Sequence, residues 1–349
     1  DPMHGPQVAS CSSYREDRDA KTGFWYTACT TGYLFPGIPL YLPPAIAAAL
    51  ALTAVFVAPL FMPELSLPAP HTCGVFLLYI MTDFILRICL ALTKWRIFLR
   101  LGITQEEVAM IASKQVEIPT DDLVKKGGDW LYRADSYGRK FPHLLHWAGL
   151  SQFAVWAAAS SWGRFQFMLM GSTTSMLLKF LFFNCQNQYV NICMWLSVVR
   201  TADGFARRAN NFYCTMSSMC GAGVVVPVGT ALLAQRYGAH LHSDFLMLLS
   251  FPCAFGDCLA EIVGVNGRMR FPVYGVGEKN HKSVEGMVAM FLGSVLPCYA
   301  QAPILGWGGL CLMGVLATVA ETWSPRGFDN VFIPLACAVG VYCVMENIG

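Results

Sequence analysis

The sequence predicts an all-α, polytopic membrane protein, built as a transmembrane helical bundle of about nine spans. Of its 349 residues, 55% are hydrophobic and 13% are charged, about half the charged share of a soluble domain. The mean hydropathy is +0.47. Apolar stretches of about 20 residues, each long enough to cross a bilayer, recur from Leu42 to the C-terminus. Too little polar surface remains to cover a water-soluble globule.

The apolar stretches divide the chain into four parts. These are a polar and aromatic tail (1–41), two spans (42–92), an amphipathic surface segment (93–144) and a larger transmembrane domain (145–349). We expect spans at 42–62, 73–92, 145–162, 165–183, 212–234, 244–264, 283–301, 303–320 and 331–346. In the surface segment, Thr104 and Glu107 have capping-box spacing, which predicts a helix to about Lys114. The apolar stretch 189–199 is too short to span alone, so it is re-entrant or extends the fourth span.

The lysines and arginines lie almost entirely on one side of this predicted topology. With nine spans, that side holds 20 of the 24 basic residues, whereas the other side holds Arg164 and Arg236. This asymmetry assigns the basic side to the cytosol or its organellar equivalent. A membrane of the endoplasmic reticulum, a plastid or a mitochondrion fits the pattern equally well. The net charge of +2 gives no support to nucleic acid binding.

Two carboxylates mark the end of the sixth predicted span. Asp257 and Glu261 are four residues apart, so on a helix they share a face and repel each other. Ionisable residues at such positions are costly and are candidates for function. A divalent cation would remove the repulsion, and carboxylate oxygens suit Mg²⁺ or Mn²⁺. The alternative is a structural pair that is protonated or bound to a basic residue. Gly256 and Gly264, which flank this pair, leave room for a ligand to approach the backbone.

The next predicted span opens with Lys282 and Ser283, followed by Glu285 and Gly286. A helix N-terminus offers backbone N–H groups and the positive end of the helix dipole, which favour phosphate. Lys282 would add a positive charge there, although lysines at span ends also serve as interfacial anchors. The segment is not a P-loop, because His281 stands where the second glycine belongs.

Two further polar groups are predicted on the same side of the membrane. Arg139, Lys140 and His143 precede the third span; Arg139 and His143 share a helical face, which pairs a guanidinium with an imidazole. Glu321, and then Asp329 with Asn330, are expected in the loop between the last two spans. The convergence of all these groups on the side that the charge count defines independently predicts one site.

Taken together, these motifs resemble the dolichol kinase, phytol kinase and CTP-dependent diacylglycerol kinase family. The resemblance covers about 139–345 and rests on the order and spacing of Arg139-Lys140-x-x-His143, Gly256-Asp257-x-x-Ala260-Glu261-x-x-Gly264, Lys282-Ser283-x-Glu285-Gly286, Glu321 and Asp329-Asn330-x-x-x-Pro334. It implies an integral membrane enzyme that phosphorylates a lipid alcohol with CTP and a divalent metal.

The resulting hypothesis gives each residue a role in phosphoryl transfer at the membrane surface. Asp257 binds the metal with Glu261 or Asp329, and either Asp257 or His143 accepts the proton of the alcohol. Arg139 stabilises the transferred group, and Lys282 with the N-terminus of the next span holds the triphosphate. The residues expected to contact substrate are Gly256, Lys140, Ser283, Glu285, Gly286 and Asn330.

Two other functions remain open at this level. Cytidylyl transfer, which forms a CDP-lipid and pyrophosphate, needs the same kinds of side chain at the membrane surface. A non-catalytic subunit of a larger membrane complex would retain the fold and use the unmatched residues 1–130 for docking. Outside the predicted site, Asp83 and Arg87 are four apart within the second span and are expected to form an intramembrane ion pair.

Overall fold

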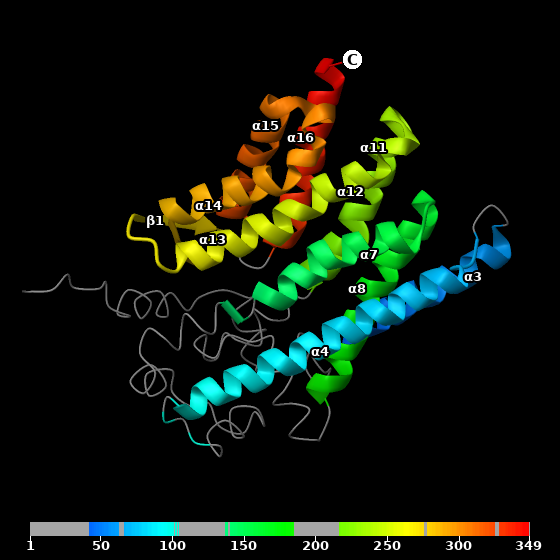
Figure 1. The fold of residues 1–349 in the computed structure, drawn as a ribbon, viewed down its shortest axis with the longest axis horizontal. Helices are drawn as coiled ribbons and strands as arrows, with labels where there is room; N and C mark the ends of the chain where they lie inside the picture. The colour runs from blue at the N-terminus through cyan, green and yellow to red at the C-terminus, as the bar shows by residue number, and fades with distance from the viewer. Residues whose placement is uncertain are drawn as a thin grey trace, which may run out of the picture.

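The structure is a computed structural model that describes residues 42–62, 66–100, 102, 104, 137–138, 140–184, 216–275, 278–324 and 328–348. The described chain is almost entirely helical (Figure 1), which confirms the predicted all-α membrane fold. Its first half contains α3 (Leu42–Phe61), α4 (Pro70–Arg100), the π-helical turn η1 (Leu145–Gly149), α7 (Leu150–Ala157) and α8 (Ser161–Asn184).

The second half of the described chain alternates long helices with short irregular turns. Its helices and turns are η3 (Gly221–Val225), α11 (Val226–Tyr237), η4 (Ala239–Leu241), α12 (His242–Phe251), η5 (Pro252–Gly256), α13 (Asp257–Gly264), α14 (Val284–Val295), η6 (Leu296–Gln301), α15 (Ala302–Trp323) and α16 (Asp329–Ile348). Two strands, β1 (Arg270–Gly275) and β2 (Glu278–Ser283), separate α13 from α14.

Five helical segments of the described chain are long and apolar enough to cross a membrane, judged by length and composition. They are Pro70–Arg100, Met216–Tyr237, Ala239–Gly264, Val284–Trp323 and Asp329–Asn347, and a shorter apolar helix covers Ala45–Phe61. The segment Val284–Trp323 contains both α14 and α15, which pack against each other. Each predicted span overlaps a helix, so the transmembrane character is confirmed and the number nine stays a prediction.

Two helices extend beyond the predicted spans. Helix α4 continues past residue 92 to Arg100, and its residues Lys94 and Phe98 are buried. The Lys94 ammonium lies 5.7 Å from the centre of the Phe98 ring. Residues 140–144 are also helical and lead directly into the third predicted span, so both span boundaries stay predictions. The tail 1–41, the stretch 189–199 and, apart from Thr104, the predicted helix to Lys114 lie outside the described residues.

A β-hairpin stands where the sequence predicted a loop between spans. Strands β1 and β2 pair antiparallel, with Arg270 opposite Ser283 and Gly275 opposite Glu278. The backbone N–H of Val284 donates to the Met269 carbonyl at 2.9 Å, so the pairing extends to the first residue of α14. The hairpin therefore fixes where α14 begins, and it holds the Lys282 backbone beside the end of α13.

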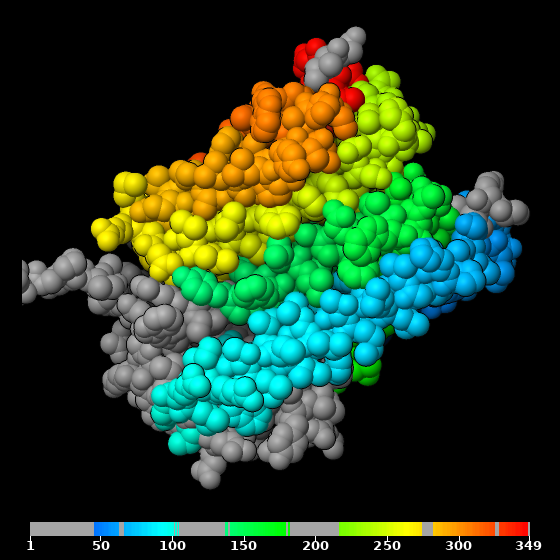
Figure 2. All heavy atoms as spheres, viewed as in Figure 1, coloured from blue at the N-terminus to red at the C-terminus, as the bar shows by residue number. Residues whose placement is uncertain are grey.

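Helix α12 lies at the centre of the bundle. Its side chains from Phe245 to Ser250 are all buried, as expected for a helix that is apolar all round, and it packs against α7, α11 and α16 (Figure 1). Figure 2 shows α4, which runs from blue to cyan, beside α7 in green; α3 and α4 both pack against α8. Because η5 and α13 continue α12 directly, the acidic residues of α13 are attached to this buried helix.

Gly293 brings α14 into close contact with η5. A Cβ at this position would lie 2.8 Å from the Phe255 carbonyl oxygen and 2.9 Å from the Gly256 Cα. Both are backbone atoms, so relief requires a shift of the whole helix. We expect Gly293→Ala to lower the free energy of unfolding by about 2 kcal/mol.

The matched control for this substitution is Gly308→Ala in α15, where a Cβ would meet nothing within 4 Å. It should change stability by no more than about 0.5 kcal/mol. The measurement is the melting temperature of each purified variant in detergent. Equal melting temperatures for the two variants would contradict the close contact between α14 and η5.

Candidate active site

Lys140 lies between the two carboxylates of α13. Its Nζ is 2.7 Å from Oδ2 of Asp257 and 2.9 Å from Oε2 of Glu261. The four-residue spacing therefore does place both acidic side chains on one face of the helix, as predicted. All three side chains are no more than 10% exposed. In this arrangement the ammonium group of Lys140 offsets part of the repulsion between the carboxylates.

His143 contacts the same carboxylate from the next turn of its helix. Its Nε2 is 2.9 Å from Oδ2 of Asp257 and 2.9 Å from the carbonyl oxygen of Cys253. That carbonyl can accept because the π-helical turn η5 shifts the backbone pairing: the N–H of Asp257 bonds to Pro252, five residues back. Both atoms that face Nε2 are acceptors, so this nitrogen carries the hydrogen and His143 is a donor toward Asp257.

Lys282 forms a second ion pair, with Glu321. The Lys282 ammonium donates to both the side chain and the main-chain carbonyl of Glu321. Glu321 was predicted in a loop but lies in the last turn of α15, where 92% of its surface is buried. Burial disfavours the charge of Lys282, but the adjacent carboxylate outweighs this effect and raises the pKa of Lys282. Lys282 is therefore a cation throughout the physiological pH range.

Asp329 and Asn330 begin α16, so the prediction that they lie in a loop was wrong. The Asn330 side-chain amide donates to Oγ of Ser217 at 3.3 Å and to Oδ1 of Asp329 at 3.2 Å. Asp329 interacts electrostatically with Asp257, Lys140 and Lys282. The start of α16 is thus tied to the segment before η3 and faces both ion pairs.

The predicted phosphate-binding end of α14 is partly occupied by its own residues. Ser283 is the N-cap, as expected, and its Oγ accepts the N–H of Gly286 at 3.1 Å. The Glu285 carboxylate accepts the backbone N–H groups of Arg268 at 2.8 Å and Met269 at 3.2 Å. In this structure Glu285 therefore orders the turn that leads into the hairpin.

Gly256 and Gly286, the two glycines expected to contact substrate, are used for helix packing. A Cβ at Gly256 would meet Oγ of Ser294 at 2.7 Å and the Met290 sulfur at 2.9 Å. A Cβ at Gly286 would meet the Ala260 carbonyl at 3.0 Å and the Gly264 Cα at 3.1 Å. Both glycines therefore allow α14 to lie against η5 and α13, which carry the acidic residues.

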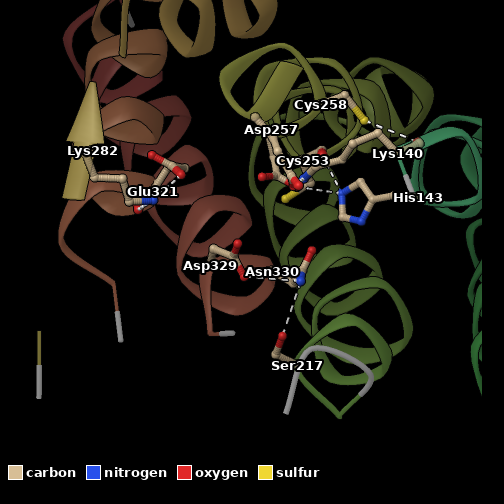
Figure 3. A network of polar contacts seen from close by, with 11 residues as sticks. Lys140, His143, Ser217, Cys253, Asp257, Cys258, Lys282, Glu321, Asp329 and Asn330 are labelled. Carbon is tan, nitrogen blue, oxygen red and sulfur yellow. Dashed lines mark hydrogen bonds and ion pairs between the residues drawn. The ribbon is translucent and has the colours of Figure 1, made fainter. Parts of the chain in front are cut away.

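These side chains form one charged cluster, which we define as Lys140, His143, Asp257, Glu261, Lys282, Glu321 and Asp329. Figure 3 shows Lys282 and Glu321 on one side of Asp257, and Lys140 and His143 on the other. Arg139, the remaining predicted catalytic residue, lies outside the described residues. With a neutral imidazole, two ammonium groups and four carboxylates give the cluster a formal charge of −2.

The predicted metal ligands divide into a pair and a more distant residue. Asp257 and Glu261 converge on one cation, the Lys140 ammonium, and Asp329 does not contact it directly. Within the described ranges, no group of three or more His, Cys, Asp and Glu residues could hold a metal ion. Mg²⁺, however, is commonly bound by one or two carboxylates together with water and substrate phosphates. The Asp257–Glu261 pair fits that mode of binding.

Several partners in the cluster were not predicted from the sequence. They are the Ser217 hydroxyl, the Cys253 carbonyl, the Cys258 thiol, whose Sγ is 3.5 Å from the Lys140 carbonyl oxygen, and Glu321 as the partner of Lys282. The ion pair of Glu321 could have been expected from the sequence, because a carboxylate next to an apolar span needs a cation. The others are a carbonyl and two small side chains within apolar helices, and no sequence pattern distinguishes them.

No family model matches the chain, and no curated protein or solved structure is significantly similar to it. The fold and the site together define an all-α integral membrane protein. Its acidic and basic residues, drawn from segments more than 100 residues apart, meet in a largely buried cluster.

Proposed function

We propose that this protein is an integral membrane lipid kinase that transfers the γ-phosphoryl group of CTP, or of another nucleoside triphosphate, to a lipid alcohol. The observation that carries the proposal is the charged cluster itself. Asp257, Glu261 and Asp329 meet Lys140, His143 and Lys282 among apolar helices, although they come from separate parts of the chain. Burying so many charges is costly, and membrane proteins retain such groups chiefly for function.

The charges of the cluster suit a nucleotide that arrives with a divalent cation. A formal charge of −2 would repel a bare triphosphate, whereas a metal complex of the nucleotide brings compensating positive charge. Asp257 and Glu261 would hold Mg²⁺ or Mn²⁺, which when bound neutralises the phosphates and polarises their oxygen atoms. Lys282 stays protonated, as its raised pKa implies, and we assign it to the triphosphate. Arg139 keeps its predicted role at the transferred phosphoryl group.

The hydrogen bonds of His143 bear on which residue accepts the proton of the alcohol. Because Nε2 of His143 donates toward Asp257, the imidazole orients this carboxylate, and we assign the acceptance of the proton to Asp257. In the proposed reaction the alcohol oxygen bonds to the γ-phosphorus, the bond from that phosphorus to the bridging oxygen breaks, and CDP leaves. Asp257 takes the hydroxyl proton.

The acceptor is proposed to be a lipid because the cluster lies at the ends of apolar helices that are long enough to cross a membrane. Its hydroxyl would reach the polar site while its apolar tail lies along helix surfaces rich in exposed leucine, valine and phenylalanine. Phytol, a polyprenol, dolichol and diacylglycerol all combine one hydroxyl with a long apolar tail. Partners other than the lipid and the bilayer are not needed for this reaction.

The test is product analysis with the purified full-length protein in detergent. CTP labelled on the γ-phosphate, and in parallel CTP labelled on the α-phosphate, is supplied with Mg²⁺ and, in separate reactions, each of the four alcohols and a lipid phosphate such as phosphatidate. Transfer of the γ-label to lipid with release of CDP is the expected result. Transfer of the α-label to a lipid phosphate with release of pyrophosphate would replace the proposal by cytidylyl transfer. No labelled lipid under any condition, together with no nucleotide binding, would favour a non-catalytic subunit.

A further inference from the structure

The side chain of Lys140 occupies the position at which two carboxylates converge. Its Nζ is within 3 Å of an oxygen of both Asp257 and Glu261, and all three groups are largely buried. The sequence had assigned Lys140 to the substrate and the two carboxylates to a metal. In the structure these groups bind one another. Oδ2 of Asp257 and Oε2 of Glu261 therefore have two candidate cations, the Lys140 ammonium and a divalent metal ion.

One ammonium group does not match the charge of this pair. Two carboxylates four residues apart on one helical face carry two negative charges; Lys140 supplies one positive charge, and His143 donates a hydrogen bond to Asp257. A divalent cation would match the pair fully, and hard oxygen ligands suit it. However, two positive charges cannot share the space between these oxygen atoms, because they would repel strongly in a buried environment.

A change of side-chain conformation would be enough to move the Lys140 ammonium group away from the two carboxylates. The contact of Cys258 with Lys140, in which Sγ lies 3.5 Å from the carbonyl oxygen, does not involve the ammonium group. The four-carbon side chain is flexible and can move its charged end while the backbone stays in place. Asp329, a further carboxylate of the charged cluster, interacts electrostatically with Lys140.

We propose that Lys140 is the resident cation of the Asp257–Glu261 pair and that it competes with the divalent cation for these carboxylates. This deepens the proposed function, because it names the residue that must move when a metal–nucleotide complex binds. Lys140 holds the two carboxylates together before the nucleotide arrives. Its displacement then releases one ammonium group at the place where phosphate charge has to be neutralised.

The test is Mn²⁺ binding to the purified protein in detergent, without nucleotide or lipid. Binding is measured as the loss of the electron paramagnetic resonance signal of free Mn²⁺. Lys140→Met removes the competing charge and keeps a side chain of similar length. We expect it to bind Mn²⁺ about tenfold more tightly than the unmodified protein. Lys140→Arg retains a competing cation and should stay close to the unmodified protein. Replacing both Asp257 and Glu261 by their amides should abolish this binding.

The matched control uses the ion pair of α4. Arg87 Nε is 2.7 Å from Oδ2 of Asp83, also four residues apart and largely buried, but this pair contains a single carboxylate. Arg87→Met therefore leaves one buried carboxylate unpaired without creating a pair that could hold Mn²⁺. It should destabilise the protein without increasing the affinity for Mn²⁺.

Thermal stability gives a second readout that remains useful if Lys140→Met is poorly stable. Its melting temperature should fall without metal and recover on addition of Mn²⁺, whereas that of Arg87→Met should fall and not recover. Equal Mn²⁺ affinity in the unmodified protein and Lys140→Met, with no recovery of the melting temperature, would overturn the competition. The lipid kinase proposal would survive that result, because it is decided separately by the labelled product.

Discussion

Replacing Asp257 by Asn is expected to lower kcat for lipid phosphorylation by about 10³-fold, the largest effect on activity that we predict. Asn is nearly isosteric with Asp, but its amide neither accepts the hydroxyl proton nor carries the charge that balances the divalent cation. The fold should tolerate the change, since Lys140 keeps Glu261 as its partner at 2.9 Å. The measurement is the transfer of the γ-label from CTP to the preferred lipid alcohol under saturating substrate.

The control is Asp83→Asn, which also neutralises a buried, ion-paired aspartate, but in α4 and outside the charged cluster. This variant should lose stability because Arg87 is left without its carboxylate, while the kcat of the folded fraction stays close to that of the unmodified protein. Unaltered phosphorylation by Asp257→Asn would rule out Asp257 as the catalytic carboxylate.

Removing the ammonium of Lys282 is expected to lower the stability of the protein strongly. In Lys282→Met the Glu321 carboxylate would remain buried without its cation, because the Glu321 side chain is only 10% exposed. The Lys282 side chain is 24% exposed, so solvent screens part of the loss. We expect the free energy of unfolding to fall by about 2–3 kcal/mol. Chemical unfolding in mixed micelles measures it.

The double variant Lys282→Met with Glu321→Gln separates the structural role of this ion pair from its role toward the substrate. With the carboxylate neutralised as well, most of the lost stability should return, as a double-mutant cycle would quantify. Activity should not return, because the charge assigned to the triphosphate is still absent. Recovery of activity together with stability would show that Lys282 only supports the fold.

The membrane helices could be predicted from the sequence because the lipid environment imposes a strong constraint: a span needs about 20 apolar residues. The same constraint says where a span can lie but not where its helix ends: hydropathy falls at Lys94, whereas Lys94 is buried and the helix continues to Arg100. The β1–β2 hairpin was missed because β2, with the sequence EKNHKS, is polar throughout and lacks the alternation of a half-buried strand.

The composition of the charged cluster could be predicted, but its pairing could not. Spacing placed Asp257 and Glu261 on one helical face, and the distribution of charge placed Lys282 and Lys140 on the same side of the membrane. Which ammonium group contacts which carboxylate depends on how distant helices pack together; Lys140 and Asp257, for example, are 117 residues apart in the chain. The sequence carries no local signal for such a choice, so the pairs Lys140–Asp257 and Lys282–Glu321 emerge only from the three-dimensional arrangement.

The π-helical turn η5 has a consequence for the orientation of α13. Such a turn accommodates one more residue than the α-helical turn it replaces, and each residue of an α-helix advances the direction of its side chain by about 100°. The single extra residue between Pro252 and Gly256 therefore sets the rotation of α13 about its axis relative to α12. The residue that faces Lys140 is thus decided by the length of this turn as much as by the identity of position 257.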